Sequence, residues 1–330
     1  MTADLQKVED LWFPDGNVII RAGERICRVY KGFLTSQSPV LADMFSIPQP
    51  PDAQTMDGLP VVVFPDAPED VLHWLKAMLF PRSFEAYPVK IEMHQLFAVL
   101  RLSHKYDVQH LRRRALYHLS TVLPTELATK FPLRGDMDAS IIISYCGDHD
   151  CHAFLLNVVP LVHEIGAVWL LPAALYQLHT AYHIPYNPKI SLVALTDALP
   201  AIDVARLWRI AHALPRAFPH SLTDKWTVED CKYCVDLSGE AIEGTYQSLL
   251  TDPLEFYGPA DEMDDDESSD YESYILIVRM CSPCYREARK DYRGMAQRFW
   301  DALPGLLELP TWEELRAMKA SDVGTTNTTT

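Results

Sequence analysis

The sequence predicts an α+β fold for the first third of the chain, a small sheet capped by helices, followed by a mostly α-helical region. Residues 18–20 and 25–30 lie on either side of a turn at Gly23, which is typical of a β-hairpin. The apolar run 61–64 predicts a short, fully buried strand. From about residue 125 to residue 226, apolar residues recur only at helical spacing between prolines.

Four helices are expected in the first third. They cover residues 35–45, 67–80, 93–106 and 108–123. Pro68 falls in the first turn of the second helix, where its missing N–H leaves no hydrogen bond unmade. The residues expected to be buried around the first helix are Leu34, Leu41, Met44 and Phe45.

Composition excludes several classes of protein. The chain has 330 residues, of which 48% are hydrophobic, enough for one large domain or two ordinary ones. A formal net charge of -16 repels phosphate backbones, so no nucleic-acid partner is expected. Seven cysteines, an odd number, argue against a disulfide framework.

The hydropathy pattern predicts no membrane partner. Residues 1–10 are polar and acidic and contain no apolar core of a secretory signal. The most apolar stretch, 155–175, includes Asn157, His163 and Glu164 and is expected to form buried helices. We therefore expect an intracellular protein, in the cytoplasm, the nucleus or both.

The chain is expected to divide into five parts. Trp169 and Trp208 are large enough to anchor a second core in the helical middle. Eight of the twelve residues 261–272 are acidic, which predicts a disordered insert. The predicted parts are a polar lead-in (1–9), the α+β domain (10–124), a helical region (125–226), a four-cysteine subregion (227–318) containing the acidic disordered insert (258–273), and a disordered tail (319–330). The helices expected after the first third are 141–146, 151–168, 173–182, 191–199, 202–213, 286–303 and a short one after Pro310 with a cap formed by Thr311 and Glu314.

Residues 29–45 carry the most specific pattern of the chain. A short strand leads into a helix, with a Ser-Pro pair at 38–39 between two turns, and this run resembles the core signature of the BTB/POZ domain. Residues 15–18 match the opening of the family's first hairpin, and 102–108 with Leu111 resemble its later helix pair. The resemblance covers about residues 10–123. The matching positions in the core run are Val29, Lys31, Leu34, Ser38, Pro39, Met44 and Phe45.

This resemblance implies a domain for protein–protein contact without catalytic residues. Cys27 and Leu41 stand where the family usually has Phe, and both are compatible with a core. Tyr30 stands where the family has a buried, hydrogen-bonding His, so that polar network is not carried over. Many animal members dimerise by exchanging an N-terminal strand. Only about ten residues precede Leu11 here, so homodimerisation is left open.

Loop aromatic residues are the candidate anchors for a partner. Specific contacts between proteins bury roughly 800 Å² on each side and depend on a few aromatic or Arg anchors. The alternative interpretation is that these residues are partly exposed members of the core. The candidates are Trp12, Phe13, Phe84 and Tyr87.

Two Cys-x-x-Cys pairs predict a structural zinc site. Cys231 and Cys234 form the first pair, and Cys281 and Cys284 form the second. Four thiolates can surround Zn²⁺ in a tetrahedron with no open position, which is typical of a structural site and not of a catalytic one. The 46 residues between the pairs exceed ordinary zinc-ribbon spacing, and the acidic insert accounts for part of the excess. Four free buried thiols and redox-active pairs remain alternatives.

Together, these features resemble the BTB proteins expanded in fungi. The additional element is the closing Leu-Pro-x-Trp-Glu-Glu-Leu segment at 309–315. Ser268 and Ser269 lie among acidic residues, a context that acidophilic kinases prefer, so regulatory phosphorylation is a hypothesis. The basic run 112–114 is interpreted as a solvated helix face, with contact to an acidic partner as the alternative.

The sequence therefore predicts a non-enzymatic interaction module or adaptor acting through its N-terminal domain, with a zinc-stapled helical part. The resemblance implies two specific versions, a substrate adaptor of a cullin-type ubiquitin ligase and a transcription-linked scaffold. A third alternative is an enzyme with a site in residues 125–318, which requires a pocket with converging polar groups.

Overall fold

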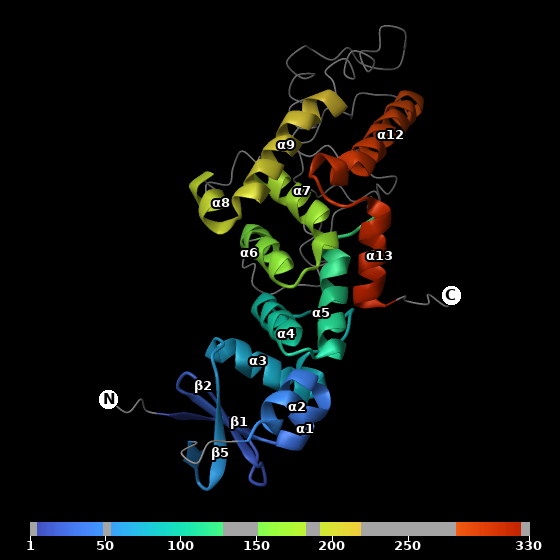
Figure 1. The fold of residues 1–330 in the computed structure, drawn as a ribbon. Coiled ribbons are helices and arrows are strands. Elements are labelled where there is room, and N and C mark those ends of the chain that lie inside the picture. Colours follow the sequence, from blue (N-terminus) through green and yellow to red (C-terminus); the bar gives the residue numbers. More distant parts are fainter. Residues whose placement is uncertain (1–4, 49–53, 128–150, 183–191, 219–281, 325–330) are drawn as a thin grey trace, which may run out of the picture. The chain divides into compact units, whose positions relative to one another are not determined.

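The computed structural model describes residues 5–48, 54–127, 151–182, 192–218 and 282–324, and these form an α+β fold (Figure 1). The chain divides into two compact units. The first consists of the described residues within Met1–Leu123, Pro132–Leu170 and Ala317–Thr330, and the second of those within Pro124–Phe131 and Leu171–Arg316. The mixed α+β class expected from the sequence is confirmed.

Five strands form the sheet of the first unit, in the order β1-β3-β2-β5-β4. Strands β2 (Val18–Ala22) and β3 (Arg25–Val29) are antiparallel and joined by a turn in which Gly23 has φ +54°, a value that favours glycine. This is the hairpin that the sequence predicts. Strand β5 (Leu59–Phe64) runs parallel to β2, and β4 (Thr55–Met56) pairs with β5.

Strand β1 (Gln6–Trp12) was not expected from the sequence. It lies at the edge of the sheet, parallel to β3, and its register shifts between Lys7 and Trp12. Leu11 is its only fully buried residue, so the strand lacks the apolar alternation that would identify it in the sequence. The expected lead-in at residues 1–9 therefore includes part of a strand.

Residues 61–64 form a strand, as predicted, but the prediction that it is fully buried is wrong. Val63 is 58% exposed and only Phe64 is buried. The reason is that helices cover one face of the sheet only. Phe64 contacts Trp74 and Tyr106 on that face, at centroid distances of 6.2 and 5.2 Å.

The helix expected over 35–45 is two helices, α1 (Lys31–Gln37) and α2 (Pro39–Ser46), separated at Ser38. Pro39 occupies the first turn of α2, which its fixed φ favours. Leu34 and Leu41 are fully buried as expected, whereas Met44 and Phe45 are only half-buried.

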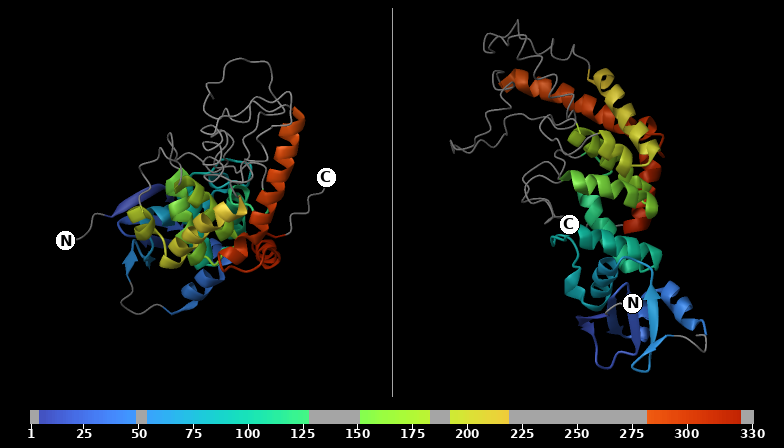
Figure 2. Two further views of the ribbon diagram at one scale, coloured as in Figure 1. Left: turned by 90° about the horizontal axis from the view of Figure 1, so that it is seen from above. Right: turned by 90° about the vertical axis from the view of Figure 1, so that its left-hand side faces the viewer.

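Helices α3 (Pro68–Leu79), α4 (Met93–Lys105) and α5 (Gln109–Val122) confirm the other three helices expected in the first third. Figures 1 and 2 show α3 between the sheet and α4. Trp74 of α3 is fully buried, and its Nε1 donates to Ser103 Oγ at 3.2 Å. This contact satisfies the one polar atom of the indole inside the core.

The first unit also includes α6 (Cys151–Glu164) and the 3₁₀ turn η2 (Val168–Leu170). Phe154 of α6 packs on Phe97 of α4, with ring centroids 5.7 Å apart. The last residues of helix α13 (Trp312–Val323) belong to this unit as well.

The second unit contains α7 (Leu171–Tyr182), α8 (Leu192–Ala198), α9 (Ala201–Ala217), α12 (Ser282–Leu306) and the start of α13. Among its described residues, Trp300 and Trp312 are both buried, and their rings stack with centroids 4.9 Å apart. Trp169 is fully buried, but it belongs to the first unit. Trp208 is 51% exposed, so the prediction that it anchors a core is wrong.

A capping box begins α13, as the sequence predicts. Thr311 N–H donates to Glu314 Oε2 at 2.8 Å, and Glu314 N–H donates to Thr311 Oγ1 at 3.3 Å. The hydrogen bond from the Thr311 N–H lowers the pKa of the Glu314 carboxyl. Helix α13 continues to Val323, into the residues expected to be a disordered tail. The expected helix at 141–146 and the acidic insert lie outside the described residues.

Candidate interaction surface

Most of the predicted metal site lies outside the described residues. This holds for Cys231, Cys234 and Cys281, while Cys284 falls in the first turn of α12, where side chains are not described. Within the described ranges, no three His, Cys, Asp or Glu side chains gather in a way that could hold a metal ion. The zinc site therefore stays a prediction. Ser268 and Ser269 also lie outside the described residues.

Cys27 is a buried free thiol on the helix-covered face of the sheet. Its burial raises the pKa of the thiol to about 12, and Lys76 and Arg25 oppose this only in part. Because the thiolate is the reactive and metal-binding form, this side chain acts as a small apolar residue. The structure thus places Cys27 in the core, as expected.

Ser38 connects α2 to the corner between α4 and α5. Its hydroxyl oxygen accepts a 3.0 Å hydrogen bond from the Leu41 N–H, which caps α2. The same hydroxyl donates to the Tyr106 carbonyl, and Ser38 is 1% exposed. The Ser-Pro pair of the motif therefore has a structural role: Ser38 caps the helix and Pro39 begins it.

Tyr30 replaces the expected histidine and makes a different polar contact. Its hydroxyl donates to Asp15 Oδ1 at 2.7 Å, and this hydrogen bond raises the pKa of the phenol. Asn17 Oδ1 accepts the Lys31 N–H at 2.8 Å at the start of α1. The loop at 15–17 therefore holds the beginning of α1 through two side chains.

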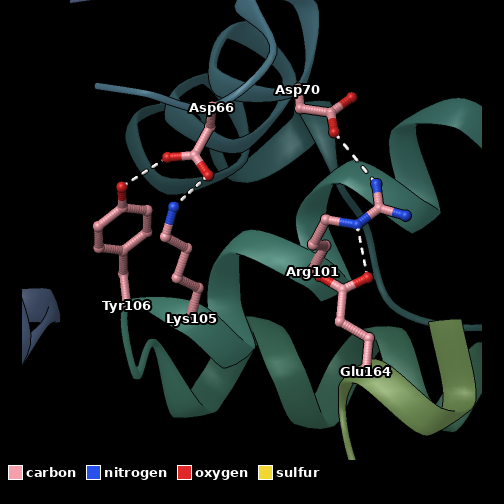
Figure 3. Close-up of polar contacts among 6 residues, drawn as sticks. All are labelled: Asp66, Asp70, Arg101, Lys105, Tyr106 and Glu164. Atoms are coloured by element: carbon pink, nitrogen blue, oxygen red, sulfur yellow. Dashed lines mark hydrogen bonds and ion pairs between the residues drawn. The ribbon is translucent and has the colours of Figure 1, made fainter. Parts of the chain in front are cut away.

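Ion pairs and hydrogen bonds connect α4 to α3, to α6 and to the loop between β5 and α3 (Figure 3). Asp66 accepts from Lys105 and, at 2.6 Å, from the Tyr106 hydroxyl. Arg101 of α4 donates to Asp70 at 3.2 Å and to Glu164 of α6 at 2.9 Å. The latter contact fixes α6 to the domain. Burial, and the hydrogen bond that the Tyr106 hydroxyl donates to Asp66, raise the pKa of Tyr106.

The loop before α4 is held by three side chains in succession. The carbonyls of residues 83–85 accept from Gln95, Arg114 and His118, respectively. His118 is fully buried, and its Nε2 lies 3.0 Å from the Glu85 carbonyl. Because a carbonyl only accepts, Nε2 carries the hydrogen, and Nδ1 is a buried acceptor that finds no donor among the residues that the structure describes.

The aromatic anchors predicted in loops differ in their exposure. Phe84 is 1% exposed and packs on His118, so it is a core residue and not an anchor. Trp12 and Phe13 are half-buried, and Tyr87 is 37% exposed. Only Tyr87 and, in part, Trp12 and Phe13 are placed to contact a partner.

The helix pair α1–α2 exposes apolar side chains that sequence reasoning missed. Phe33 is 36% exposed, Val40 40% and Ile47 63%. Val40 lies in the first turn of α2, Ile47 is the extended residue that directly follows this helix, and Phe33 lies on α1. We call these three residues the α1–α2 patch. They were missed because their spacing resembles that of core positions.

No family model, curated protein or solved structure matches this chain. None of the described helices has the length and apolar character needed to cross a membrane.

Proposed function

We propose that this protein is a non-enzymatic interaction protein, and that residues 10–124 form a BTB/POZ-type domain that recruits a protein partner. The observation that carries the proposal is the α1–α2 patch, three exposed apolar residues on, or directly after, a pair of helices anchored by a buried core. Exposed apolar side chains at such a position favour contact with another protein.

The order of the elements supports the same proposal. Hairpin β2–β3 leads into α1 and α2, then β5, then α3, α4 and α5. This is the succession implied by the resemblance, including the Ser38-Pro39 junction at the start of α2. The junction ties the patch to the α4–α5 corner, so the patch is held in place by the core.

Aspartate substitutions in the patch test this function. The full chain, with and without Val40→Asp or Phe33→Asp, is used as bait in extracts of its own cells, and retained proteins are quantified by mass spectrometry. Val89→Asp is the matched control, because Val89 is 43% exposed in the loop before α4. We expect a specific partner to be retained by the wild type and by Val89→Asp, and to be lost from both patch variants.

Sedimentation velocity on the same variants distinguishes a second copy of the chain from a different protein as the partner. A wild-type dimer that dissociates in Val40→Asp identifies the partner as a second copy of the chain. A cullin among the lost proteins identifies a ligase adaptor, and transcription proteins identify a scaffold. Equal retention of all proteins by all variants contradicts the proposal.

A further inference from the structure

The sheet of the first unit has a second face, turned away from the helices. Side chains alternate between faces along a strand. Phe64 packs on Trp74 and Tyr106, which defines the helix-covered face. Arg21 and Val63 are register partners one position before that face's residues, so both point to the other side. No described helix of the unit covers that side in Figures 1 and 2.

Register extends this face across β3 and β1. Arg21 pairs with Ile26, and Ile26 pairs in turn with Lys7. Trp12 pairs with Arg28 beyond the register shift, and the Lys7 ammonium lies 4.5 Å from the Trp12 ring centroid. We call this surface the outer sheet face. Its residues are Lys7, Trp12, Ile19, Arg21, Ile26, Arg28, Val61 and Val63.

The outer sheet face combines an apolar floor with fixed cations. Ile19 is 0% exposed and Ile26 2%, so their neighbours cover them. Arg21 Nε donates to the Gly23 carbonyl at 2.9 Å, and Arg28 Nε donates to the Gly16 carbonyl at 2.8 Å. Both arginines are half-buried, so each covers part of the sheet with its side chain. Val63, at 58% exposure, leaves an uncovered apolar area beside them.

The cations of this face lack acidic partners. Lys7, Arg21 and Arg28 make no ion pair within the part of the chain that the structure describes. On the helix side of the same unit, by contrast, Lys76 pairs with Asp10 at 3.0 Å, and Lys105 pairs with Asp66. Three cations without an ion pair, against the exposed Glu9 at the β1 edge, give this face a positive balance in a chain with net charge -16.

The surface chemistry favours one kind of occupant. Carboxylates would pair with the three cations, and apolar side chains would cover Val63 and the exposed edge of Trp12. A nucleic-acid backbone offers charge without apolar cover, and the chain's net charge repels it. Addition of a strand at the β1 edge is disfavoured, because Glu9 and Asp10 place exposed charges there.

We propose that the outer sheet face binds an acidic, partly apolar segment of a partner protein. The inference rests on the proposed function, since it names a partner class for the same domain. It concerns a different surface, however, and its test uses substitutions outside the α1–α2 patch. Binding through exposed charges predicts an affinity that falls as ionic strength rises.

Fluorescence anisotropy on the full chain tests this inference. The probe is a labelled 12-residue peptide in which Glu and Asp alternate with Leu and Phe. Arg21→Glu and Lys7→Glu are each expected to weaken binding about tenfold, since charge reversal replaces attraction with repulsion. Arg113→Glu is the control for charge, because Arg113 is exposed on α5 and makes no ion pair in the described part. It is expected to bind as the wild type does.

A second pair of variants tests the apolar contact. Val63→Ser is expected to weaken binding, whereas Val89→Ser, at 43% exposure in the loop before α4, is not. Thermal unfolding of each variant verifies the fold, and Lys7→Gln replaces any reversal variant that unfolds. Val40→Asp must bind the peptide normally, which separates this result from a failure of the proposed function.

Several results would overturn the inference. These are no peptide binding by the wild type, equal binding by all variants, or equal loss in Arg113→Glu. Binding of duplex DNA or of phosphatidylserine vesicles in place of the peptide, with loss in Arg21→Glu, would identify another class of ligand. Self-association that Arg21→Glu abolishes would identify a second copy as the occupant.

Discussion

At the scale of single residues, Ser38 has the largest predicted effect among the motif positions. Ser38→Ala removes the cap of α2 and leaves the buried Tyr106 carbonyl without its donor. We expect a loss of about 2 kcal/mol in the free energy of unfolding. Chemical denaturation measures it. Ser36→Ala is the control, because the Ser36 hydroxyl donates to the Phe33 carbonyl and accepts from Gln37 Nε2, both at exposed positions. Equal effects of the two substitutions would contradict this role for Ser38.

His118 makes the first unit sensitive to acid. Burial lowers the pKa of this histidine below 6.5, and Arg114 acts in the same direction against the hydrogen bond to Glu85. The folded state therefore resists protonation of His118. The stability of the unit is retained above the unfolded pKa and is lost as pH falls from that value to the lower folded pKa. Three other histidines, His73, His104 and His110, shift in the same direction through burial.

The variant His118→Gln isolates the contribution of His118 protonation to the loss of stability in acid. Glutamine can still donate to the Glu85 carbonyl but does not titrate. We expect the midpoint of thermal unfolding to drop less between pH 7.5 and 5.5 in His118→Gln than in the wild type. His212→Gln, at an exposed histidine of α9, should keep the wild-type drop. An unchanged drop in His118→Gln would show that this histidine does not carry the acid sensitivity.

At the scale of elements, a buried ion pair connects α9 to the end of α12. Arg206 donates to Asp203 at 2.8 Å and to the Leu307 carbonyl at 2.8 Å, and Asp203 is 0% exposed. Removing one partner of a buried pair leaves a charge in a medium that solvates it poorly. A neighbouring pair, Arg209 with Glu308 at 2.8 Å, is exposed and serves for comparison.

We expect Arg206→Ala to destabilise the second unit by about 3 kcal/mol, and Arg209→Ala by less than about 1 kcal/mol. Denaturant titration of both variants measures the difference. Comparable losses would show that burial does not decide the contribution of these pairs.

Elements and caps that depend on nearby residues could be predicted from the sequence. The hairpin around Gly23 and the Thr311 cap with Glu314 involve residues a few positions apart. Strand β1 could not, because an edge strand needs little apolar surface and shows no alternation. Trp208 was expected to anchor a core because it is large, but size does not determine which face of α9 other elements cover.

The candidate surfaces were harder to predict than the elements. Phe84 was expected in an exposed loop, but contacts from Arg114 and His118 to its loop bury it. Phe33 and Val40 occupy positions that look like core in the sequence, and they are exposed. The outer sheet face depends on the register of strands far apart in the chain, which local patterns do not determine.

At the scale of the whole molecule, metal content is the test of the four-cysteine prediction. We expect elemental analysis of the purified full chain to find about one zinc per molecule, and Cys231→Ser to lose it. Cys27→Ala should retain the metal, because Cys27 is buried in the sheet. Absence of zinc in the wild type would favour free thiols or redox pairs.

The first unit is completed by the last described helix. Asp322 accepts from Arg112 at 2.8 Å and from Trp169 Nε1 at 2.8 Å, and an acidic residue at a helix C-terminus is otherwise unfavourable. The contact with Arg112 spans 210 positions along the chain. During synthesis, the ribosome therefore releases α5 long before its carboxylate partner exists. This unit can reach its final form only after translation of Asp322, and its late closure predicts slow folding.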